Sequence, residues 1–174
     1  ITAVNDAPVN TVPGAQTTNE DTSLVLTGLS ILDVDSGSGD LVLTLSVNSG
    51  VLVINTGISG GVSAGQISNN NTATVVVTSP LANINNTLAD AAGLAYQPTT
   101  DSNGSDTLTV LTSDQGNTGT GGTLTDTDTV SITITAVNDA PVNTVPGAQT
   151  TNEDTNLTVS GISIADVDAS GGSI

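Results

Sequence analysis

The side chains of this sequence that could do chemistry are nearly all carboxylates. The chain carries 17 acidic residues, almost all of them Asp, and it has no Lys, Arg, His or Cys. Several acids stand in short motifs with other oxygen donors, such as Asp33-Val34-Asp35 and Asn138-Asp139. Calcium binds about six to eight oxygens from carboxylates, amides and backbone carbonyls, whereas magnesium demands a tighter geometry and keeps more water. The motifs therefore predict sites for calcium.

The missing residue types exclude most enzymes. Without His or Cys there is no Ser-His-Asp triad, no thiol nucleophile and no ordinary zinc site. Without Lys or Arg there is no Schiff base and no basic groove for nucleic acid. The triplet Asp35-Ser36-Gly37 matches an aspartic protease motif, but the corresponding Asp168-Ala169-Ser170 breaks it. A carboxylate-only hydrolase would need a cleft and positioning groups for which the sequence offers no candidates. We therefore expect no enzyme, no catalytic residues and no nucleic-acid partner.

The net charge of −17 has no internal counter-charge. Carboxylates brought together by folding must be neutralised from solvent, or their repulsion opposes the compact state. The absence of Cys is compatible with a bacterial surface and leaves the chain without disulfides. No apolar run approaches the length of a membrane span, and the sequence has no signal peptide or initiator Met. We expect a piece of a longer extracellular protein that does not insert into membranes.

The chain repeats itself. Residues 1–22 recur unchanged at 134–155, and a looser match continues, so that each residue of the first copy corresponds to the one 133 positions later. Such identity indicates tandem duplication of one structural unit. We predict a linker at 1–6, a complete repeat at 7–139 and the N-terminal part of the next repeat at 140–174. Because this last part is too short to bury a core alone, we expect its own chain or another molecule to complete it.

Alternating apolar and polar residues predict short β-strands. Such alternation covers 41–47 and 129–136, and β-branched runs also occur at 23–28, 51–54, 72–78, 94–97 and 107–113. Thr suits the solvent face of such strands. About seven strands separated by Gly, Asn, Asp and Ser predict an all-β, immunoglobulin-like antiparallel sandwich.

One segment has helical rather than strand periodicity. Ser79 and Pro80 match an N-cap followed by a first-turn residue, and Leu81, Ile84 and Leu88 then fall at helical spacing before Gly93. The pattern predicts a short helix at 80–91.

An immunoglobulin-like strand order, with strand A at about 8–18 and strand B at 23–31, sorts the acids to opposite ends of the sandwich. The group expected at the exit end is Glu20, Asp21, Asp101, Asp106, Asn138 and Asp139. The group expected at the entry end is Asp33, Asp35, Asp114, Asp126 and Asp128, the last two in a long loop, with Asn5 and Asp6 in the preceding linker. In the next copy Asp166 and Asp168 correspond to the Asp33 and Asp35 pair, and the short linker would bring them towards the exit group.

Several of these acids have a second interpretation. Asn138-Asp139 before Ala-Pro could be only a turn, and Asp101 and Asp106 are as consistent with Asx turns as with ligands. The loop acids Asp114, Asp126 and Asp128 could form a separate site or simply solvate a loop. The Asp33-Val34-Asp35 motif is stronger, because it is retained in the second copy, whereas Asp40 becomes Ser there and is not a candidate ligand.

Several motifs, taken in order, resemble those of a known family. AVNDAP resembles the DxND-type linker of cadherins, DVD resembles their DxD pair, and Glu20 stands where they place an acidic calcium ligand. YQPTTDSNGSDTLTV, SDQG and DTVSITITAVNDAP look like the cadherin-like tandem repeats of large bacterial surface adhesins. The resemblance covers the whole chain and implies calcium-rigidified extracellular arrays that extend adhesins or build biofilm matrix. Ala136 replaces the first acid of the linker, which implies fewer calcium ions per junction.

Two functions follow as hypotheses. The first is a structural repeat, an extender or filament module whose partners are neighbouring repeats and whose junctions calcium stiffens. The second is an adhesin domain that binds a glycan or a host protein through loops such as 55–71 or 114–128. With a single aromatic residue in the chain there is no stacking platform for sugars. The structural hypothesis is the one we favour, and neither identifies an adhesive target.

Overall fold

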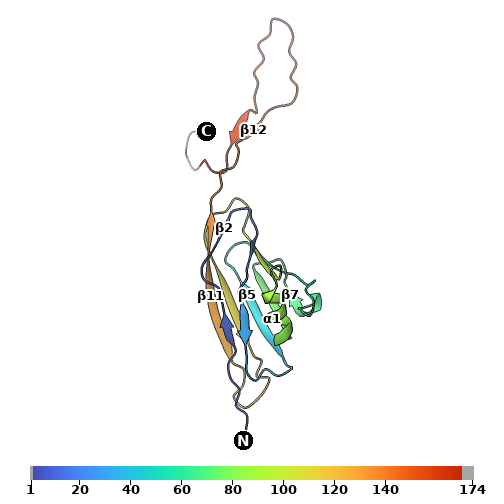
Figure 1. The fold of residues 1–174 in the computed structure, drawn as a ribbon. Helices are drawn as coiled ribbons and strands as arrows, with labels where there is room; N and C mark the ends of the chain where they lie inside the picture. Colours follow the sequence, from blue (N-terminus) through green and yellow to red (C-terminus); the bar gives the residue numbers. More distant parts are fainter. Residues whose placement is uncertain (1, 170–174) are drawn as a thin grey trace. The chain divides into compact units, whose positions relative to one another are not determined.

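The computed structural model describes residues 2–169 and divides into two compact units, with the division between Ala136 and Val137 (Figure 1). We call them unit 1 and unit 2. No helix in the described residues is long and apolar enough to cross a membrane.

The larger sheet of unit 1 has six strands. Its order is β2 (Gln16–Asn19), β11 (Thr125–Thr135), β10 (Gly104–Ser113), β5 (Asp40–Ser46), β8 (Thr74–Pro80) and β7 (Ile67–Ser68). All neighbours pair antiparallel except β2 and β11, which run parallel. Figure 1 shows β2 and β11 side by side, with β7 at the other flank. The predicted segment 107–113 lies within β10, and those at 41–47, 72–78 and 129–136 overlap β5, β8 and β11 but extend one or two residues beyond them.

A smaller sheet covers the core of unit 1 from the other side. It consists of β3 (Leu24–Val25), β9 (Leu94–Gln97) and β6 (Val51–Ile54). A two-stranded pair, β1 (Val9–Thr11) and β4 (Ser30–Leu32), and a short 3-10 helix, Ala64–Gln66, complete the unit. Leu52 and Tyr96 of the smaller sheet and Leu43 of the larger one are buried in one hydrophobic cluster. The predicted mostly antiparallel β-fold, with sheets sharing a core as in a sandwich, is therefore confirmed.

The one α-helix of the described residues, α1 (Leu81–Ala89), lies within the predicted segment 80–91. Ile84 and Leu88 are buried on its inner face, as their spacing requires. The predicted cap was wrong. Ser79 belongs to β8, and Pro80 is both the last residue of that strand and the N-cap. The buried Ser79 hydroxyl instead accepts a hydrogen bond from Gln66 Nε2 at 2.9 Å.

The predicted strands at 8–18 and 23–31 each break into two. Residues 9–11 pair with β4, whereas residues 16–19 pair with β11 in the larger sheet. Pro13 and Gly14 lie at the first break, where proline cannot donate to a ladder. The second break contains Gly28, whose φ of 82° is a left-handed conformation that glycine adopts at little cost. These breaks let one stretch of sequence change sheets.

Up to residue 169, where the described part of unit 2 ends, the unit contains one strand pair, β12 (Val142–Thr144) with β13 (Ser163–Ala165). Its register is that of β1 with β4, shifted by the repeat length, so the duplicated sequence folds in the same local way. Ile162 and Ile164 are 63% and 56% exposed, while their counterparts Leu29 and Ile31 are buried.

Candidate metal centres

The clearest candidate site lies at the entry end of unit 1, where Asp33 and Asp35 follow β4. Asp33 is only 7% exposed. Its Oδ1 accepts the Asp35 N–H at 3.1 Å, and Asp35 Oδ2 accepts the Asp6 N–H at 3.0 Å. The remaining oxygens, Asp33 Oδ2 and Asp35 Oδ1, are buried and have no hydrogen-bond partner. Buried polar atoms are nearly always satisfied, so this pair lacks a positively charged or proton-donating partner.

The local sequence explains how the two acids come to lie together. The Asp33 side chain closes an Asx-type turn on the Asp35 N–H, and the Ser36 hydroxyl donates to the Asp33 carbonyl at 3.3 Å. Val34, between the acids, is 73% exposed. Burial raises the pKa of Asp33, and the neighbouring Asp35 carboxylate raises it further, although backbone hydrogen bonds oppose both. The electrostatics of the pair therefore favour binding of a cation or a proton.

Asp114 and Asn5, two further predicted ligands at the entry end, bind each other. Asn5 Nδ2 donates to Asp114 Oδ2 at 2.5 Å and to the Gly122 carbonyl at 2.9 Å. Asp114 Oδ1 accepts the N–H groups of Gly116 and Leu124, both at 2.8 Å. Burial raises the pKa of Asp114, but these hydrogen bonds outweigh it and leave the pKa below its ordinary value. Asp114 is thus a satisfied internal anchor, and we leave it out of the proposed ligands.

The sequence predicted Asp126 and Asp128 in the loop before the last strand of unit 1, but both residues lie in β11 itself. Asp126 Oδ2 accepts the Asn10 N–H at 2.7 Å and Oδ1 accepts the Thr127 N–H at 2.9 Å. Asp128 is two residues further along the same face of the strand and is half-buried. Asp126 therefore ties β1 to β11, which is a structural role.

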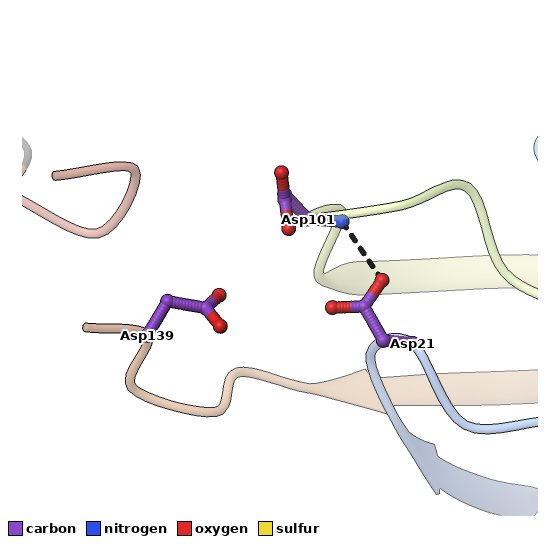
Figure 2. Close-up of side chains that lie close together, drawn as sticks. All are labelled: Asp21, Asp101 and Asp139. Carbon is purple, nitrogen blue, oxygen red and sulfur yellow. Dashed lines mark hydrogen bonds between the residues drawn. The ribbon is translucent and has the colours of Figure 1, made fainter. Parts of the chain in front are cut away.

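At the exit end, Asp21 and Asp101 lie on adjoining turns. The Asp101 N–H donates to Asp21 Oδ1 at 3.1 Å (Figure 2). Both residues are exposed and have left-handed φ values of 57° and 54°. Nearby in sequence, Glu20 is buried, and its Oε2 accepts a 3.4 Å hydrogen bond from Asn103 Nδ2. Three predicted ligands of the exit group thus lie on two turns of unit 1.

Asp139, also drawn in Figure 2, belongs to unit 2. Because it follows Ala136 by three residues, the chain limits the distance between their Cα atoms to about 11 Å. Within unit 2 the Asp139 N–H donates to Asp168 Oδ2, and the Asp168 N–H donates to Asp166 Oδ1 at 3.0 Å. The same two bonds join Asp6, Asp35 and Asp33 in unit 1, so the motif forms its arrangement from local sequence in both copies.

Asp106, another predicted ligand of the exit group, has its oxygens occupied by protein donors. Oδ1 accepts the N–H groups of Asn48 at 2.9 Å and Thr107 at 2.6 Å. Oδ2 accepts the Ser49 N–H at 3.1 Å and the Tyr96 hydroxyl at 2.8 Å. Burial raises the pKa of Asp106, but these four bonds outweigh it and lower the pKa overall. We therefore leave Asp106 out of the proposed ligands.

The Tyr96–Asp106 contact makes a prediction for alkaline solution. Tyr96 is fully buried, and burial together with the Asp106 carboxylate raises its pKa well above the ordinary value. Since Tyr96 is the chain's single Tyr, near-ultraviolet absorbance reports on it alone. We expect no tyrosinate near pH 10 in the folded protein, followed by its appearance together with unfolding at higher pH. Tyrosinate formed near pH 10 with the far-ultraviolet circular dichroism unchanged would contradict the buried contact.

Sequence reasoning missed the part played by the loop before β11. The Thr118 hydroxyl donates to the Asp35 carbonyl, and Asn117 Nδ2 donates to the Asp40 carbonyl at 2.7 Å. Gly116, Gly119 and Gly121 in this loop have positive φ. The clustering of these glycines in the sequence could have indicated the contact, because glycines allow a loop to approach another backbone segment closely.

Comparison with models of known protein families found no match. A search of curated proteins also found no matching protein.

Proposed function

We propose that the chain is part of a calcium-stiffened structural repeat of an extracellular surface or filament protein, with an immunoglobulin-like, cadherin-like sandwich as its unit. The observation that carries this proposal is the pair of buried, unpartnered oxygens on Asp33 and Asp35. A chain without Lys, Arg or His has no side chain that could neutralise them. A divalent cation from solvent supplies that charge, and oxygen donors in an irregular loop suit calcium.

The proposed ligands come from two stretches of sequence that the ion would join. Asp33 and Asp35 lie in the loop after β4, and Asp6 lies in the segment before β1, with its N–H already bound to Asp35. Oxygens from both stretches would coordinate the calcium ion, which would hold the segment around Asp6 against the loop that carries Asp33 and Asp35. The ion would therefore neutralise repulsion and reduce the freedom of the entry to the repeat.

A second group of ligands belongs to the exit end. Asp21, Asp101 and Glu20 lie on neighbouring turns there, and the chain itself carries Asn138 and Asp139 just beyond the end of β11. In a tandem array this linker leads from the exit end of one repeat to the Asp166 and Asp168 pair of the next. Calcium bound along this path would convert a short linker into a fixed junction, and stiffness would be the function.

Calcium titration tests the proposal. We expect heat of calcium binding by calorimetry, weaker binding of magnesium, and a thermal unfolding midpoint that rises with calcium. At a hundredfold excess over Kd the gain is about 2.7 kcal/mol. Chelation should leave the sandwich folded while making residues near 136–141 sensitive to proteases. Replacement of the exposed Asp40 by Asn is the matched control and should change nothing. No binding heat and no shift in midpoint at millimolar calcium would refute the proposal.

A further inference from the structure

Residues 3–5, near the start of unit 1, are bound by the loop between β10 and β11. We define this clamp loop as residues 114–124. Val4 forms a parallel bridge with Thr120, in which the Asn5 N–H donates to the Thr120 carbonyl at 3.0 Å and the Thr120 N–H donates to the Ala3 carbonyl at 2.9 Å. The Thr120 hydroxyl also donates to the Ala3 carbonyl at 3.2 Å. Residues 3–5 are therefore held as a short added strand.

The Asn5 side chain anchors this strand inside the clamp loop. Asn5 is 5% exposed and donates to the Asp114 carboxylate and to the Gly122 carbonyl. Asp114 is 1% exposed and is itself fixed by the N–H groups of Gly116 and Leu124. A buried, charge-assisted hydrogen bond of this kind is among the stronger ones in proteins. None of these contacts requires a metal ion.

Gly119 allows the strand and the loop to approach each other. A Cβ atom at this position would lie 2.5 Å from the Asn5 nitrogen and 2.6 Å from the Val4 carbonyl carbon, and the φ of Gly119 is 88°. Both obstacles are backbone atoms, so they cannot move aside as a flexible side chain would. Any residue other than glycine should push the strand out of the loop.

The second copy of the same sequence provides an internal comparison. Residues 134–141 are identical to residues 1–8, but the described part of unit 2 has no counterpart of the clamp loop. There Asn138 is exposed, and its Nδ2 donates to the carbonyl of its own neighbour Asp139 at 3.0 Å. The sequence alone therefore does not bury the Asn side chain, whereas the loop does.

We propose that the clamp loop is a binding site for the exit segment of the preceding repeat, a peptide of sequence Ala-Val-Asn, and that it holds this segment without calcium. The inference rests on the proposed function for its tandem setting. β11 ends at Thr135, and Ala136-Val137-Asn138 follows directly. If this segment were bound by the clamp loop of a following repeat, no free residue would remain between β11 and that loop. The clamp would then set the direction in which one repeat leaves the other, and calcium would reinforce it.

Hydrogen exchange measured by NMR in the presence of a chelator tests the clamp in the full chain. We expect the amides of Asn5 and Thr120 to exchange slowly in the wild-type protein. Asn5→Ala should speed their exchange by at least about tenfold, as loss of a hydrogen bond to a charged group implies. The matched change Asn138→Ala, in the same sequence context, should leave both amides as they are. Gly119→Ala should act like Asn5→Ala, with the amides of Leu108 and Ile132 still protected.

The outcomes separate this inference from the proposed function. Free exchange of Asn5 and Thr120 in the wild-type chain, or equal effects of Asn5→Ala and Asn138→Ala, would overturn the clamp. Calcium titration of the same samples is read independently. If the amides are protected and no calcium binds, the clamp holds and the proposed function fails. Should calcium bind while both amides exchange freely, the proposed function holds and the clamp fails.

Discussion

The double change Asp33→Asn and Asp35→Asn should raise the unfolding temperature in calcium-free buffer and lower it, relative to wild type, in calcium. The folded-state pKa of Asp33 is raised, chiefly by burial. Above its unfolded-state pKa of about 3.9, ionised Asp33 therefore costs stability, and the cost disappears as pH falls and the group protonates. Neutral Asn removes this cost and keeps an oxygen for the Asp35 N–H. It also removes the charge that attracts the ion.

The calcium arm of this experiment has the larger effect. The Asp33 and Asp35 site should contribute about 2.7 kcal/mol at a hundredfold excess of calcium over its Kd. The variant should lose this contribution and keep only that of the exit group. Thermal denaturation with chelator and with calcium measures both arms, and Asp40→Asn serves as the control for charge removal alone. A variant that keeps the wild-type calcium response would show that the ion binds elsewhere.

Asp106→Ala should destabilise unit 1 by roughly 3 kcal/mol or more, whether or not calcium is present. The change leaves the Tyr96 hydroxyl and the N–H groups of Asn48 and Ser49 without their acceptor. Hydrogen bonds to a charged group each contribute about 1.5–3 kcal/mol, and buried donors left unsatisfied add to the loss. Urea denaturation gives the difference in the free energy of unfolding.

Tyr96→Phe and acid titration refine this prediction. Tyr96→Phe removes one of the four donors to Asp106 and should cost less than Asp106→Ala. Because the folded pKa of Asp106 is lowered, its contribution is complete above the unfolded value of about 3.9 and disappears as pH falls through the folded pKa. The stability difference between wild type and Asp106→Ala should therefore shrink in acid. A constant difference down to pH 2 would contradict the assignment.

The sequence predicted the strands of unit 1 well where alternation was regular. The segments 41–47 and 107–113 became β5 and β10 because every second side chain meets the shared core. It failed where one extended stretch serves two sheets, at Gly28 and at Pro13-Gly14, because period-two patterning does not say which sheet a strand joins. The Ser79 cap failed because strand pairing with β5 extends through Pro80 and overrides the local capping preference.

The sequence grouped the acids but did not separate those with unpartnered oxygens from those whose oxygens accept hydrogen bonds within the protein. Asp33 and Asp35 have oxygens without protein partners, whereas Asp106 and Asp114 are satisfied by backbone N–H groups. Sequence separates these cases poorly, because some of the donors that satisfy each acid come from residues far along the chain. Asn48 is 58 residues from Asp106, and Asn5 is 109 residues from Asp114.

The parallel pairing of β2 with β11 determines how unit 1 bears a pull along the chain. Once the contacts of residues 3–5 and the β1–β4 pair have yielded, tension reaches β2 through its upstream end and β11 through its downstream end. Because the two strands run in the same direction, the opposed forces slide them past each other. The hydrogen bonds that pair Gln16–Asn19 with Ile132–Thr135 are then loaded in shear and share the force. An antiparallel pair pulled from one side would instead peel open one bond at a time. The strand order thus favours a unit that resists stretching before it unravels.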